Sequence, residues 1–159
     1  MKKKVHEAIF VILYILEYGI NVNFKDSTTY ANEYMKIKAE DENMKNYREV
    51  VEKFEKFNNF ILYISENIES PFSTEIYGVE SRNYKFQMSI AMIIAAIFSK
   101  EYFKANLDKI NKKDILSRIQ NSLLNSFIED TEYRASTTNS KKIKELVENF
   151  LNLIKTMYN

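Results

Sequence analysis

The sequence contains no cysteine, one histidine (His6), one proline (Pro71) and two glycines, Gly19 and Gly78. The absence of cysteine excludes disulfides and thiolate chemistry and is typical of a reducing compartment, so we expect a cytoplasmic protein. Two isolated glycines exclude a glycine-rich phosphate-binding loop. One histidine falls short of the three or four ligands of a zinc site. Helices can therefore run almost unbroken, while the usual residues of an active site are scarce.

The sequence also lacks an excess of charge of either sign, because 23 Lys and Arg residues nearly cancel 22 Asp and Glu residues and leave a net charge of +1. No field of the whole protein would attract nucleic acid, so any such binding requires a local basic patch. Long apolar runs are missing too. The run at 90–98 is about half of a membrane span, and the basic start of the chain has no signal-peptide cleavage site, so we expect no membrane association.

Apolar periodicity predicts a helix over residues 3–18, with Gly19 as its left-handed C-cap. A second helix should open at Asp26 or Ser27 and run to about residue 38. The third helix, over 47–68, is predicted most clearly. Its apolar residues alternate in spacing between three and four, namely Tyr47, Val50, Phe54, Phe57, Ile61, Ile64 and Ile68. Such a seam favours an internal bundle partner and leaves open a homodimer through this helix. Phe60, Leu62 and Tyr63 predict that the second half of the helix is buried on most sides.

The one long break, 70–83, holds Pro71 and Gly78, and its apolar residues Phe72, Ile76 and Tyr77 should hold it against the core. Residues 84–103 are apolar nearly all round and predict a buried fourth helix. Further helices are expected from Asn111 to about residue 127, and from Asn139 or Ser140 to the end. The sequence thus predicts a single all-α domain over 1–159, a compact bundle of about six helices.

One local feature indicates a binding site. Lys141 and Lys142 stand in the first turn of the predicted last helix, where the helix dipole disfavours cations, and no acid follows before Glu145. Cations, hydroxyls and free backbone N–H groups together suit a phosphate or a carboxylate. The candidate anion- or partner-binding residues are Thr138, Asn139, Ser140, Lys141 and Lys142, with Arg82 and Arg134 as further cations. The alternative is an ordinary polar cap with two solvated lysines.

Catalysis is not predicted. No sequence motif pairs His6 with a nucleophile or a carboxylate. Nothing else in the sequence indicates an activated nucleophile, a metal cage or a tuned acid–base pair. We therefore expect no catalytic residue, no metal and no cofactor.

Four short motifs in order resemble the C-terminal helical region of the ParB-like proteins of GmrSD-type phage-restriction systems. They are Asn32-Glu33-Tyr34-Met35, the seam over 47–68, Pro71-Phe72 with Arg82-Asn83-Tyr84-Lys85-Phe86, and Thr138-Asn139-Ser140-Lys141-Lys142. The D-G-Q-Q-R motif of that family's nuclease-like NTPase domain does not occur in this sequence. The resemblance implies a helical accessory role beside a nuclease or NTPase partner, and neither NTP hydrolysis nor DNA cleavage is transferred to this chain.

Two functions follow as hypotheses. The chain is a non-catalytic helical interaction module related to restriction-type phage defence, which acts through a partner protein or DNA. The alternative is a small inhibitor encoded by a phage or mobile element that binds a defence nuclease. An upstream reading frame with D-G-Q-Q-R would favour the module, and a phage anti-defence gene cluster would favour the inhibitor.

Overall fold

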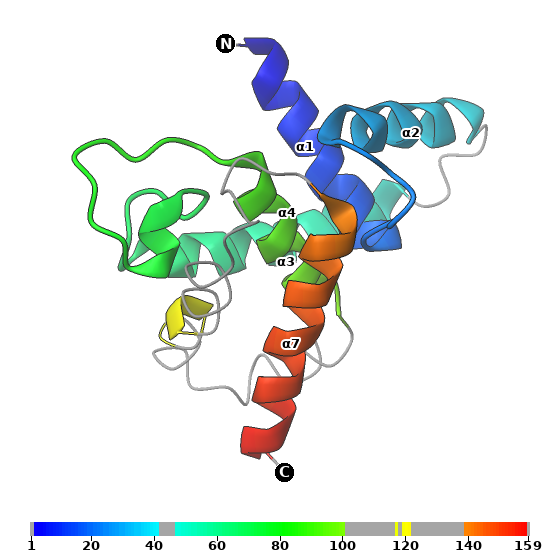
Figure 1. The fold of residues 1–159 in the computed structure, drawn as a ribbon. Coiled ribbons are helices and arrows are strands. Elements are labelled where there is room, and N and C mark those ends of the chain that lie inside the picture. The colour runs from blue at the N-terminus through cyan, green and yellow to red at the C-terminus, as the bar shows by residue number, and fades with distance from the viewer. Residues whose placement is uncertain (1, 42–46, 101–116, 118, 122–138, 159) are drawn as a thin grey trace.

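The computed structural model describes residues 2–41, 47–100, 117, 119–121 and 139–158 (Figure 1). The elements within these residues are the helices α1 (Lys2–Tyr18), α2 (Ser27–Glu40), α3 (Tyr47–Ser65), α4 (Met88–Ser99) and α7 (Ser140–Tyr158), and the 3-10 helix η1 (Thr74–Tyr77). No strand occurs in these ranges, so the predicted all-α bundle of about six helices is confirmed. Most of the helix predicted over 111–127 lies outside the described residues.

The end of α1 and the start of α2 lie at local signals that the sequence predicts. Gly19 adopts φ 75°, in the left-handed region, and its N–H donates to the Ile15 carbonyl at 2.8 Å, which closes α1. The Asp26 carboxylate caps α2 by accepting hydrogen bonds from the backbone N–H and the hydroxyl of Thr29. These hydrogen bonds also lower the pKa of Asp26.

Contacts between α1 and α2 join their starts and their ends. The Glu7 carboxylate accepts a hydrogen bond from the Ser27 hydroxyl at 2.9 Å, while Glu17, near the end of α1, pairs with Lys38, near the end of α2. The two helices are therefore not an antiparallel hairpin. Residues 19–26 instead run back along α1 to reach the start of α2 (Figure 1).

Helix α4 is the centre of the fold, as its sequence predicts. All residues at 89–98 are buried, and both α1 and α7 pack against this helix (Figure 1). The helix begins at Met88, later than the expected residue 84. The Gln87 N–H donates to the Phe72 carbonyl at 2.7 Å, so the N–H of the residue before Met88 bonds to the preceding loop and not within the helix.

Two expectations for the third helix were wrong, namely that its second half is buried on most sides and that it runs to residue 68. Ile61 is only partly buried, and Leu62 is 58% exposed, whereas Phe57, Phe60 and Ile64 are buried. Successive residues turn by about 100°, so Leu62 points roughly 200° away from Phe60 and from Ile64, toward solvent. The second half of α3 therefore buries one stripe and not most of its circumference. The helix also ends at Ser65, so that the buried Ile68 lies beyond it.

The segment between α3 and α4 is held against the core, as predicted. Ile76 and Tyr77 are buried within η1, and Phe72 packs against the core with partial exposure. The Ser73 hydroxyl accepts the Glu75 N–H and caps η1, and Gly78 closes it at φ 73°. Across the described part of the chain, no helix combines the length and apolar character that crossing a bilayer requires.

Candidate functional site

The start of α7 has the cap that the sequence predicts. The Asn139 side-chain oxygen accepts the Lys142 N–H at 3.2 Å, and the Asn139 carbonyl accepts the Ile143 N–H at 3.0 Å. Asn139 therefore satisfies one of the N–H groups that would otherwise be open to an anion. Thr138 and Arg134 lie outside the described residues.

Ser140 belongs to the core and not to the surface. Its side chain is 2% exposed, and its hydroxyl donates to the Phe24 carbonyl at 2.9 Å. The same oxygen lies 2.8 Å from the hydroxyl of Tyr30, which in turn accepts the Asn21 N–H at 3.1 Å. Burial raises the pKa of the Tyr30 phenol, which therefore stays neutral. This network joins the start of α7 to residues 19–26, so the Ser140 hydroxyl is a structural group that faces away from any ligand in solvent.

The lysines of the first turn remain on the surface in a setting of mixed charge. Lys141 is exposed, and the Lys142 ammonium lies 3.9 Å from the Glu145 carboxylate. One turn further, Lys144 and Glu148 approach each other at the same distance, 3.9 Å. The start of α7 thus presents cations next to exposed carboxylates. This pattern is better suited to binding a partner protein than to binding the phosphate backbone of a nucleic acid.

Arg82 does not join this turn. It is exposed on the loop between η1 and α4, and Figure 1 shows that loop on the far side of α4 from the start of α7. The residues proposed from sequence therefore separate into two places in the fold. Asn139, Lys141 and Lys142 lie at the start of α7, and Arg82 lies on the loop.

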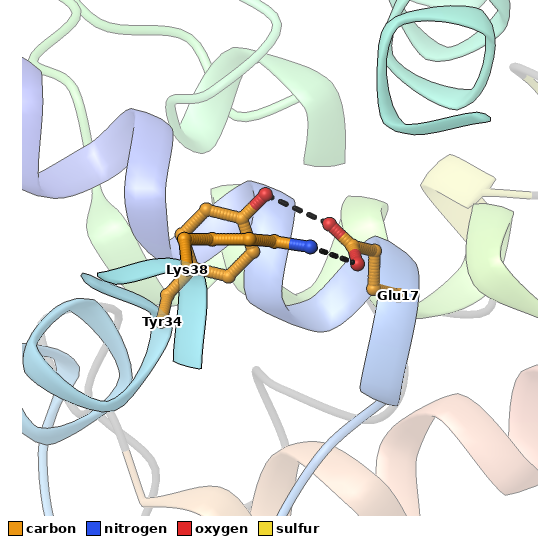
Figure 2. Close-up of polar contacts among 3 residues, drawn as sticks. All are labelled: Glu17, Tyr34 and Lys38. Atoms are coloured by element: carbon orange, nitrogen blue, oxygen red, sulfur yellow. Dashed lines mark hydrogen bonds and ion pairs between the residues drawn. The ribbon is translucent and has the colours of Figure 1, made fainter. Parts of the chain in front are cut away.

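A polar cluster between α1 and α2 was not predicted (Figure 2). The Tyr34 hydroxyl donates to one oxygen of the Glu17 carboxylate at 2.7 Å, and the Lys38 ammonium lies 2.8 Å from the other. The Lys38 ammonium also stands 5.2 Å from the centre of the Tyr34 ring. Spacing on α2 places Tyr34 and Lys38 on one face, but nothing in the sequence pairs them with Glu17, because that contact depends on how the helices cross.

The chemistry of this cluster is that of a helix-to-helix link. Burial, together with the hydrogen bond to Glu17, raises the pKa of Tyr34. Burial alone would lower the pKa of Lys38, but the hydrogen bond and the charge of Glu17 outweigh it and raise that pKa. The Glu17 side chain is only 9% exposed and both of its oxygens are engaged, so it is not placed to act as a free general base.

Metal-binding groups do not gather within the described ranges, where no three His, Cys, Asp or Glu side chains are close enough to hold an ion. His6 is exposed on α1. No protein-family model, curated protein or solved structure matches the chain.

Proposed function

We propose that this chain is a non-catalytic helical interaction module of a restriction-type phage-defence system, and that it acts through a partner protein. One observation supports this most directly. The carboxylates, phenols and hydroxyls that lie at least partly buried between α1, α2 and α7 are used to join these helices, as Glu7, Glu17, Tyr30, Tyr34 and Ser140 show. Because these side chains already bond to one another between the helices, recognition of a partner falls to the side chains on the surface.

The resemblance to the helical region of the ParB-like proteins supplies the defence context of the proposal. A protein partner is favoured over DNA because Glu145 and Glu148 stand among the exposed lysines of α7, and because the net charge is only +1. The partner class that the resemblance implies is a nuclease or NTPase subunit.

The first test is for turnover. Purified protein should hydrolyse no nucleoside triphosphate and cut neither DNA nor RNA, with or without Mg²⁺ or Mn²⁺. Activity that follows the protein through successive columns and disappears in a single-residue variant would contradict the proposal.

The second test is for assembly. The chain should co-elute with the product of a neighbouring gene that carries D-G-Q-Q-R when the two are co-expressed. A chain that instead binds a defence nuclease and blocks its cleavage of DNA is an inhibitor, and the module proposal is then wrong.

A further inference from the structure

The loop between η1 and α4 presents an exposed aromatic ring on a fixed support. Phe86 is 53% exposed, and its ring meets that of Phe72 edge-to-face with centroids 6.0 Å apart. Phe72 in turn stacks on Phe57 at 6.4 Å, and Phe57 contacts Phe98 of α4 at 5.5 Å. Phe86 is thus the outer end of a row of phenylalanines that reaches into the core.

Hydrogen bonds fix the loop on both sides of this ring. The Gln87 N–H donates to the Phe72 carbonyl at 2.7 Å, directly after Phe86. The Tyr84 hydroxyl donates to the Val79 carbonyl at 3.1 Å and accepts the Ser81 N–H at 3.3 Å. A ring already held in place loses little conformational freedom when a partner covers it, which favours binding.

The same loop carries the charges that would select a partner. Arg82 and Lys85 are exposed and stand on either side of Tyr84 in the sequence. A shallow hollow of about 420 Å³, open to solvent, is lined by Glu80, Ser81, Arg82 and Tyr84. Aromatic residues and arginine are the types most enriched among residues that dominate binding energy at protein interfaces.

We propose that Arg82, Tyr84, Lys85 and Phe86, here called the Phe86 surface, bind a segment of a partner protein that pairs an apolar side chain with a carboxylate. The apolar side chain covers Phe86, and the carboxylate meets the guanidinium of Arg82, whose planar fork suits it. This inference rests on the proposed interaction function and names the surface that carries it.

A single-stranded nucleic acid is the other ligand that aromatic rings and cations can bind. Two features favour a protein segment. Glu80 lines the same hollow as Arg82, so a chain of phosphates that runs through the hollow would meet a carboxylate. The net charge of the protein is only +1, so no field of the whole protein offsets that repulsion.

The experiment selects ligands from a random dodecapeptide library displayed on phage, with the full chain as the target. Selected peptides should combine Asp or Glu with Leu, Ile, Phe or Trp. Phe86→Ala and Arg82→Glu should each weaken the binding of such a peptide about 10–30-fold in fluorescence anisotropy. Leu62→Ala and Lys36→Glu change an equally exposed apolar residue on α3 and an exposed cation on α2, and should leave the affinity as it is.

The outcomes separate the surface from the function. Peptides that bind all four variants alike would show an interaction module whose site lies elsewhere, and would overturn the Phe86 surface alone. Basic peptides, or a poly-dT oligonucleotide lost in the same two variants, would overturn the partner chemistry. A selection that enriches no peptide would count against both. Should Phe86→Ala unfold the chain, Arg82→Glu carries the same test, since it leaves the ring contact between Phe86 and Phe72 in place.

Discussion

The most direct test of the fold compares two substitutions on one helix. Phe57 and Leu62 both lie on α3, five positions apart, yet Phe57 is 3% exposed and Leu62 is 58% exposed. Replacing either by alanine removes a large apolar side chain without harming helix propensity, because alanine is the best helix former. Any difference in stability between the two variants therefore reports tertiary packing.

The structure sets the expected magnitudes. Phe57→Ala removes ring contacts with Phe72 and Phe98 and leaves a cavity between α3 and α4, at a cost of about 3–5 kcal/mol. Leu62→Ala should stay within about 0.5 kcal/mol, because the side chain is mostly in water already. With a urea m-value of about 2 kcal/mol/M, the midpoint for Phe57→Ala falls by about 2 M, and that for Leu62→Ala barely moves.

The assay is urea unfolding followed by circular dichroism, with the m-value compared among the three proteins. An unchanged m-value assigns the shift in midpoint to stability. Equal midpoints for the two variants would refute the reasoning, because the 57–60–64 stripe of α3 would then face solvent, or a partner absent from the assay.

Three further predictions concern the polar contacts. Glu17→Gln should lower the free energy of unfolding by about 1–2 kcal/mol in thermal melts, because Tyr34 and Lys38 lose a charged acceptor while Lys38 keeps part of its solvation; an unchanged melting temperature would mean that the link carries no stability. Because the folded state raises the pKa of Tyr34 above its ordinary value of 10.0, the stability it contributes is complete below pH 10 and is lost as the pH rises further. Tyr34→Phe should therefore make the alkaline loss of stability shallower, and the exposed Tyr47→Phe should not; identical slopes would contradict this assignment. Finally, if DNA is a ligand at the start of α7, affinity should fall steeply with salt and Lys141→Glu/Lys142→Glu should flatten that slope in anisotropy titrations, whereas an acidic protein partner would show the effect mainly in its association rate; a double variant that binds a confirmed ligand as well as the parent does would leave this turn as a helix cap only.

Features that depend on a few neighbouring residues were predicted well from the sequence. Gly19 ends α1, Asp26 caps α2 and Asn139 caps α7, because each signal acts within one helical turn. The buried character of α4 was equally clear, since a helix without a polar face can lie only inside the bundle.

Features that depend on distant contacts were predicted poorly. Leu62 looks like part of a buried helix end until the neighbours of α3 are known. Ser140 looks like a hydroxyl at the mouth of an anion site, but its direction is decided by Tyr30, which lies 110 positions earlier in the chain. No local pattern records such a contact, so a plausible site lost one of its members.

The same contact explains why the start of α7 is placed so firmly. Short connections between helices usually join antiparallel neighbours, whereas residues 19–26 return along α1 and place Asn21 and Phe24 beside Tyr30. The buried hydroxyls of Tyr30 and Ser140 find hydrogen-bond partners on that returning segment, Asn21 for Tyr30 and the Phe24 carbonyl for Ser140, as well as each other. The polar residues at the start of α7 therefore do two separate tasks. Ser140 fixes the helix from inside, and Lys141, one residue later, is left free to face whatever approaches from outside.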